Sequence, residues 1–241
     1  MSDLSTVRLN AGGSDRQARS TLPAPFFPGA RALPNPNARR LLAERLAAIS
    51  AKPLMAVALL AIVATALLAN HMNGFDRALK RGRLEAGIVQ MELAFTTERA
   101  VALARDWVGL RAAVPPQPGA MGWQCAGLNN GIECARASLR WDWLLIVLYA
   151  STLILVFAAG LRLRGIAPSE RHLSWMRLPV LAGLADIVEN VLMVALLTGA
   201  LSAGAVAAMG AFAVVKFTLI AVYLVGMAYF LTRRSSQRQA L

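Results

Sequence analysis

The sequence predicts an all-α membrane protein: a four-transmembrane-helix bundle with a small helical extracytoplasmic cap between the first and second spans. Three observations support this fold class. Of the 241 residues, 57% are hydrophobic and only 16% are charged, whereas soluble domains are nearer half apolar and a quarter charged. Four runs approach the roughly 20 apolar residues that cross a bilayer core. The short segments between these runs differ strongly in Lys and Arg content, which is typical of membrane topology.

The apolar runs and their flanks divide the chain into nine predicted segments. These are a disordered cytoplasmic tail (1–36), a juxtamembrane amphipathic helix (37–52), the first span (53–70), an extracytoplasmic helical loop (71–142), the second span (143–161), a cytoplasmic loop (162–174), the third span (175–200), the fourth span (205–231) and a cytoplasmic tail (232–241). The first tail is rich in proline and serine, a composition that favours disorder. We interpret the first span as a retained signal anchor, because about fifty residues precede it and no convincing small-residue cleavage site follows.

The distribution of positive charge predicts the orientation. Eight basic residues stand against three acidic ones before the first span, and the second loop and the C-terminal tail are also basic. The third loop carries no charge. The positive-inside rule then predicts a multi-pass protein of the bacterial inner (plasma) membrane with both termini cytoplasmic. The net charge of +12 is spread around apolar runs with no aromatic and basic binding module, so we expect no nucleic-acid partner.

The segment "NARRLLAERLAAIS" predicts an amphipathic helix immediately before the first span. Its leucines and its isoleucine share one face, which Arg39, Arg40 and Arg45 flank. We expect these arginines to contact anionic lipid head groups on the cytoplasmic leaflet. Docking of a membrane-protein partner or of a second copy of the chain is the alternative, and the sequence does not choose between them.

The long first loop predicts two amphipathic helices that form the cap. One apolar face is formed by Leu84, Ile88, Met91 and Phe95. A second apolar face is formed by Ala100, Leu103, Trp107 and Leu110. Thr97 is the expected N-cap of the second helix, because a threonine side chain can accept a hydrogen bond from a free backbone N–H. The sequence "VPPQPG" should end that helix, since two adjacent prolines cannot continue it.

Cys125 and Cys134 are the only cysteines, and they bracket the turn-forming sequence "AGLNNGIE". On the predicted outer side we expect a hairpin disulfide, whereas the opposite orientation would favour free thiols. Farther along, Trp141 and Trp143 are expected to anchor the second span at the outer membrane boundary. Asp142 has two interpretations, a carboxylate stabilised by the helix dipole at a helix start or an entrance charge for a ligand.

The third span contains an unusual polar group within "GLADIVENVLM". Asp186, Glu189 and Asn190 are three and four residues apart, so they share one helical face. A charge at this depth costs about 2.5–3.5 kcal/mol, so we expect that face to look inward. Antiparallel register about a turn near residue 203 places Lys216 of the fourth span opposite these residues. Tyr223 shares the face of Lys216 and is expected to extend the network.

The charges of this predicted cluster do not balance, because two carboxylates face one lysine. Burial and like-charge repulsion both favour protonation of one carboxylate. We therefore expect the pair to share a proton and to titrate as a coupled unit. The cluster has a structural interpretation, as an ion pair that sets helix register and partner choice. It also has a functional one, as a proton or ion relay or as a polar pocket for a ligand.

Several motifs together resemble a group of uncharacterised bacterial four-span integral membrane proteins. They are "MELAF" followed by "ERA" and Trp107, then "WDWLLIVLYA", "GLADIVEN" and "VVKF". The Asp-x-x-Glu-Asn pattern with a later Lys-Phe is the most specific part, and the resemblance covers about residues 88–229. The resemblance implies the four-span architecture and says nothing about activity. The N-terminal tail and the two cysteines fall outside the pattern.

For function, the sequence favours a non-enzymatic assembly or accessory protein of the membrane. The alternative is a small proton-coupled transporter, or a protein that binds a lipid or small ligand through the polar cluster. We favour a non-enzymatic role and expect no cofactor, because no nucleotide-binding, serine-hydrolase or zinc-protease motif is present. An intramembrane enzyme is the third interpretation, for which the sequence offers no identifiable pair of nucleophile and base. We expect no metal or haem site, because the two histidines, His71 and His172, fall on opposite sides of the membrane.

Overall fold

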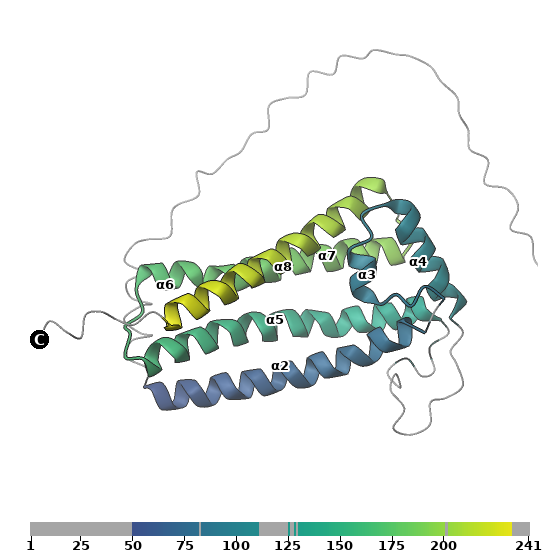
Figure 1. Cartoon of the computed structure of the whole chain (residues 1–241). Helices are drawn as coiled ribbons and strands as arrows, with labels where there is room; N and C mark the ends of the chain where they lie inside the picture. The colour runs from purple at the N-terminus through teal and green to yellow at the C-terminus, as the bar shows by residue number, and fades with distance from the viewer. Residues whose placement is uncertain are drawn as a thin grey trace, which may run out of the picture. The chain divides into compact units, whose positions relative to one another are not determined.

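The computed structural model describes residues 50–81, 83–110, 125, 128, 130–200 and 202–232, all within one compact unit, Pro36–Leu241. These residues form helices joined by turns and short connections, and they contain no strand. The helices are α2 (Ala51–Leu79), α3 (Ile88–Glu92), α4 (Thr97–Gly109), α5 (Gly131–Leu163), α6 (Glu170–Trp175), α7 (Arg177–Leu197) and α8 (Ala203–Thr232) (Figure 1). Four stretches are long and apolar enough to cross a membrane: α2, α5, α6 with α7, and α8. The predicted all-α fold with four membrane helices is confirmed.

Some predicted segments lie outside the described residues. They are the N-terminal tail, the juxtamembrane helix up to residue 49 with Arg39, Arg40 and Arg45, and the C-terminal tail from residue 233. The lipid contacts expected for these arginines stay predictions.

Two pairs of helices build the bundle. α2 packs along α5, α7 packs along α8, and α5 joins the two pairs by its contact with α7 (Figure 1). α3 and α4 lie at the end of the bundle where α2 ends and α5 begins; α3 contacts α8, and α4 contacts α5 and α8. One apolar core forms at this end, around Phe75, Trp107 and Met209, and a second forms toward the other end, around Phe157 and Leu161.

The first two membrane helices extend well beyond the predicted spans. α2 has 29 residues and α5 has 33, which corresponds to about 43 Å and about 50 Å at 1.5 Å per residue. α5 begins at Gly131 because the Asn130 side chain accepts a hydrogen bond from the backbone N–H of Glu133 at 3.0 Å. Asp142 therefore lies inside α5, and its interpretation as a helix-start carboxylate is wrong. Trp141 and Trp143 are 45% and 41% exposed, and their role as membrane anchors stays a prediction.

The first helix of the long loop is shorter than predicted. Leu84 and Phe95 lie outside α3 and are largely exposed, so the expected four-residue apolar face does not form. Phe95 has a φ of 54°, a left-handed conformation that ends the helical path before α4. Of the predicted face, Met91 is fully buried.

The second helix of the loop follows the predicted pattern. Ala100, Leu103 and Trp107 are buried, and the indole Nε1 of Trp107 donates to the backbone carbonyl of Ala86 at 2.9 Å. Its N-cap is Thr96 rather than Thr97: the Thr96 hydroxyl accepts a hydrogen bond from the backbone N–H of Arg99 at 3.3 Å. The prediction was wrong by one residue because both threonines can accept this bond.

Candidate functional site

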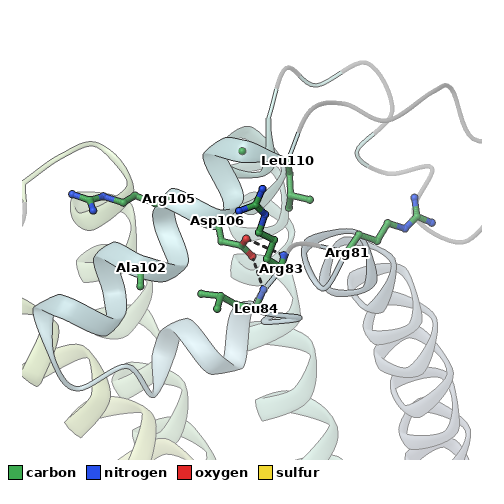
Figure 2. A pocket seen from close by; sticks show the side chains of 8 residues that line it. Arg81, Arg83, Leu84, Ala102, Arg105, Asp106 and Leu110 are labelled. Atoms are coloured by element: carbon green, nitrogen blue, oxygen red, sulfur yellow. Dashed lines mark hydrogen bonds between the residues drawn. The ribbon is translucent and has the colours of Figure 1, made fainter. Parts of the chain in front are cut away.

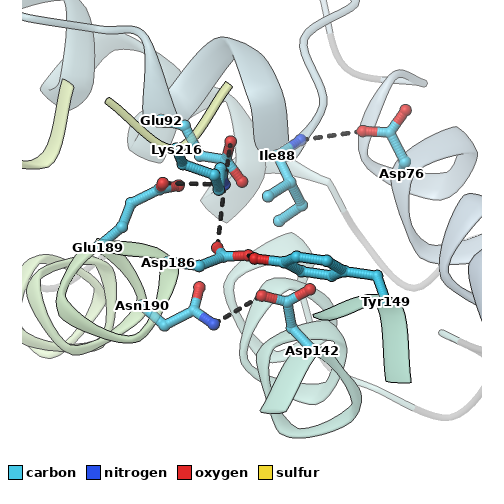
Figure 3. A network of polar contacts seen from close by, with 9 residues as sticks. All are labelled: Asp76, Ile88, Glu92, Asp142, Tyr149, Asp186, Glu189, Asn190 and Lys216. Carbon is cyan, nitrogen blue, oxygen red and sulfur yellow. Dashed lines mark hydrogen bonds and ion pairs between the residues drawn. The ribbon is translucent and has the colours of Figure 1, made fainter. Parts of the chain in front are cut away.

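Lys216 of α8 lies at the centre of a buried cluster of carboxylates (Figure 3). Its Nζ is 2.8 Å from Glu189 Oε2, 3.0 Å from Asp186 Oδ1 and 3.3 Å from Glu92 Oε2. All four side chains are buried, and Glu189 is 0% exposed. Asp186 and Glu189 come from α7, and so the predicted register between the third and fourth spans is confirmed.

The network continues into α5. Tyr149 donates its hydroxyl to Asp186 Oδ2 at 3.0 Å, and Asn190 donates its Nδ2 amide to Asp142 Oδ2 at 2.6 Å (Figure 3). Asp142 and Tyr149 are seven residues apart, or two helical turns, so they face the same neighbour. The buried network thus links α3, α5, α7 and α8. We call the residues Glu92, Asp142, Tyr149, Asp186, Glu189, Asn190 and Lys216 the polar cluster.

Contacts at the start of α3 hold Glu92 in place. Asp76, on α2, accepts a hydrogen bond from the backbone N–H of Ile88 at 2.9 Å through Oδ1. The backbone N–H of Gly87 donates to Gln90 Oε1 at 3.0 Å. A side chain at position 87 would collide with the Asp76 carboxylate, so a glycine permits this close approach. Together these contacts fasten α3 to α2 and direct Glu92, at the end of α3, toward Lys216.

Two oxygen atoms of the polar cluster remain unsatisfied. Glu189 Oε1 and Asn190 Oδ1 are buried and have no hydrogen-bond partner among the residues that the structure describes. Glu189 Oε2 lies 2.8 Å from Lys216 Nζ, but it also lacks hydrogen-bond geometry, so we treat this contact as an ion pair. A buried acceptor without a donor is unfavourable. A protonated carboxyl supplies a donor that a carboxylate lacks, so protons would help to satisfy this site.

The charges of the polar cluster are more unequal than the sequence predicted. Three buried carboxyl groups, those of Glu92, Asp186 and Glu189, and the half-buried carboxyl group of Asp142 belong to a cluster with one ammonium group. If all were ionised, the formal charge would be −3. An apolar environment strongly disfavours such an excess of charge. The arrangement is therefore suited to binding protons.

One predicted member of the cluster lies elsewhere. Tyr223 donates its hydroxyl to the backbone carbonyl of Leu153 at 2.8 Å and packs against Phe157 in the second apolar core. The prediction that Tyr223 extends the network is wrong. Seven residues along α8 bring it to the same face as Lys216 but move it about 10 Å along the helix axis.

Sequence reasoning missed two members, Glu92 and Tyr149, and misjudged the place of Asp142. Glu92 lies in the predicted loop, and the only local signal was its position between Met91 and the apolar "LAF". Tyr149 lies seven residues, or two helical turns, after Asp142. A tyrosine near the boundary of a span is normally interpreted as an interface anchor. Neither sequence position indicates that Glu92 contacts the fourth span or that Tyr149 contacts the third.

The remaining predicted residues have other surroundings. Cys125 and Cys134 form the expected disulfide at the start of α5. His71 packs edge-on against Phe75 and Trp141. Among the described residues no group of three His, Cys, Asp or Glu side chains is arranged to hold a metal ion.

Comparison of the chain with protein-family models, with curated proteins and with solved structures found no match. The function of the polar cluster therefore rests on its geometry and on the fold that holds it. That fold is an all-helical bundle with four helices long and apolar enough to cross a membrane.

Proposed function

We propose that this integral membrane protein binds protons reversibly at the polar cluster and couples their binding to transport or to binding of a small ligand. One observation carries the proposal: three carboxylates lie within 3.3 Å of a single buried ammonium group. Structural ion pairs usually match their charges, because an unmatched buried charge is costly. The surplus carboxylates of this cluster instead provide sites at which protons can be taken up and released.

Proton binding at this site would act on helix packing. Lys216 holds Glu92 of α3 as well as Asp186 and Glu189 of α7. A proton on one of these carboxylates removes its charge and weakens its attraction to the ammonium group. The change would loosen one of the contacts that join α8 to α3 and α7. A bundle held by such contacts provides a physical link between protonation and helix movement.

A purely structural role, in a protein that assembles with itself or with a partner, is the second candidate. One observation favours it: the polar cluster connects four helices, as a buried ion pair that fixes helix register would do. In that case the protons stay bound over the physiological range, and the cluster moves nothing.

Infrared spectroscopy of the purified protein in lipid tests the proton-binding proposal directly. We expect an absorption band of protonated carboxyl groups at pH 7 that decreases as the pH is raised. Glu189→Gln should remove part of this band, because Glu189 Oε1 is buried without a hydrogen-bond partner among the described residues. Glu98→Gln, on the exposed face of α4, is the matched control and should leave it unchanged. Fully ionised carboxylates at pH 6 would refute the proposal.

A charge swap separates the two candidates. The double variant Glu189→Lys with Lys216→Glu retains one ion pair but moves the charges between helices. Proton uptake by the protein in proteoliposomes, followed with a pH-sensitive dye, is the readout. Equal proton uptake by the folded swap and the wild type favours the structural role, because the polar cluster then contributes nothing to that uptake. A folded swap with lost or shifted proton uptake favours the proton-binding function.

We also propose that the α3–α4 segment forms an extracytoplasmic cap, with both termini in the cytoplasm of a bacterial cell. The basic short loops support this orientation. The disulfide between Cys125 and Cys134 supports it independently, because disulfides persist in oxidising compartments. Labelling of a cysteine introduced at exposed Arg99 with a membrane-impermeant reagent in whole cells tests the placement, and failure to label would oppose it.

A further inference from the structure

A cavity of about 520 Å³ lies between the end of α2 and the last turns of α4, away from the polar cluster (Figure 2). Arginines from three places line it: Arg81 follows α2, Arg83 belongs to the next turn, and Arg105 belongs to α4. Leu84 and Leu110 add apolar surface. Strong positive charge beside an apolar wall suits an amphiphilic anion.

Asp106 is the only acidic residue among the described residues that line this cavity, and its carboxylate is already engaged. Oδ1 accepts a hydrogen bond from the backbone N–H of Arg83 at 2.9 Å, and Oδ2 accepts one from that of Leu84 at 3.1 Å (Figure 2). Asp106 thus holds the turn that carries Arg83 against α4. The lining retains a formal charge of +2, from three arginines and one aspartate.

The side chains of Arg83 and Arg105 have no hydrogen-bond or ion-pair partner among the described residues, and both residues are exposed. A guanidinium group presents a planar set of N–H donors that matches the oxygen atoms of a phosphate. The long side chains of Arg83 and Arg105 can reorient about several bonds. They are therefore available to close on an anion in the cavity.

The position of the cavity relative to the membrane indicates which anions can reach it. The apolar run of α2 ends near residue 70, and the helix continues to Leu79, about 14 Å farther at 1.5 Å per residue. Arg81 lies two residues beyond the end of α2. With the apolar run in the hydrocarbon core, the cavity lies on the aqueous side of the membrane interface, where it faces head groups and soluble anions.

We propose that this cavity is a binding site for a phosphate-bearing anion, held by Arg83 and Arg105 with Arg81 at its edge. The anion is either the head group of an anionic phospholipid or a soluble phosphate that enters from the aqueous side. The proposal does not depend on the function of the polar cluster, which lies elsewhere in the bundle.

The experiment compares lipid and phosphate binding by the purified full-length chain. In one arm, the protein is reconstituted in nanodiscs of phosphatidylcholine with or without phosphatidylglycerol. The protein is then extracted from the nanodiscs, and the lipid molecules that it retains are counted by native mass spectrometry. In the other arm, inorganic phosphate is titrated into the protein in a zwitterionic detergent and followed by calorimetry. Both arms are repeated with Arg83→Gln/Arg105→Gln and with the matched control Arg99→Gln, an exposed arginine of α4 outside the cavity.

The double variant should bind the anion at least about tenfold more weakly, because it loses two charge-assisted contacts. Arg99→Gln should stay within about twofold of the wild type. Ala102→Phe keeps every arginine but fills the cavity, because Ala102 lies on its lining, and it should also weaken binding. Circular dichroism and gel filtration establish whether each variant is folded. If the double variant is not folded, Ala102→Phe still tests the site.

Specific retention of phosphatidylglycerol identifies the lipid head group, and binding of inorganic phosphate alone identifies a soluble anion; either result supports the site. Absence of binding in both arms overturns the proposal. So does an equal effect of Arg99→Gln and the double variant, since that result would reflect general surface charge.

Discussion

Replacement of Lys216 by methionine is the most informative perturbation of the polar cluster. Methionine keeps the length of the side chain but removes the ammonium group that three carboxylates surround. At 3.0 Å, one such pair has a Coulomb energy of about 5 kcal/mol at an effective dielectric constant near 20. Desolvation offsets much of the total, and loss of one partner from a buried pair destabilises proteins by about 3–5 kcal/mol. For a chain of this size, that corresponds to a decrease of about 6–20 °C in the thermal unfolding midpoint.

The loss of stability should depend on pH. In Lys216→Met at pH 8, the buried carboxylates that lose their ammonium partner carry uncompensated charge, which is unfavourable. At pH 5 a larger fraction of them is protonated, so their mutual repulsion and desolvation cost decrease. The difference in midpoint between Lys216→Met and the wild type should therefore be larger at pH 8 than at pH 5. Adding Glu189→Gln to the variant should recover part of the loss, because it removes one uncompensated charge.

Thermal unfolding of the purified protein in detergent, followed by tryptophan fluorescence at both pH values, measures these differences. Lys80→Met is the matched control, because Lys80 pairs with Asp76 at 2.6 Å near the end of α2, where its side chain is 43% exposed. An i,i+4 surface pair contributes only about 0.3–0.5 kcal/mol. The reasoning fails if Lys216→Met is no more destabilising than Lys80→Met, or if its effect is the same at pH 5 and pH 8.

Two further predictions concern the disulfide and the helix packing away from the polar cluster. The double variant Cys125→Ser/Cys134→Ser should lose about 2–3 kcal/mol of stability, because the disulfide closes a loop with a sequence separation of 9. An unfolding midpoint that reductant leaves unchanged in the wild type would contradict this. Gly226→Ala should cost about 1–3 kcal/mol, because the added methyl group meets the Trp175 ring. Gly204→Ala, in open space on the same helix, is its control, and equal unfolding midpoints for the two variants would contradict the packing argument.

The features predicted correctly were those that depend on neighbouring residues. Hydropathy over about 20 residues located the four membrane helices, and the i, i+3 and i+4 spacing of Asp186, Glu189 and Asn190 placed them on one face. The pairing with Lys216 was also accessible, because the short connection between α7 and α8 limits their register. The disulfide followed from two cysteines beside a turn. Helix ends were predicted less accurately, because a single hydrogen bond to a capping side chain, Asn130 or Thr96, determines where each helix begins.

The composition of the site depended on contacts between distant parts of the chain. Glu92 is 124 residues away from Lys216, and it reaches the cluster because α3 folds against α8 and is fastened to Asp76 of α2. Tyr149 joins because α5 packs on α7. A local periodicity assigns a residue to a face, but it does not say which helix covers that face.

The amino-acid sequence alone was sufficient to establish a helical membrane protein with an inward-facing charged group, because hydropathy and helical periodicity are local properties. The packing of α3 and α5 around α7 and α8 turned that group from two carboxylates and a lysine into a cluster in which three carboxylates contact one lysine and a fourth, Asp142, binds Asn190. The same packing left Tyr223 outside, because a shared helical face does not imply a shared depth. The excess of negative charge on which the proton-binding proposal depends exists only in the folded arrangement, where segments far apart in the chain bring their carboxylates to one buried ammonium group.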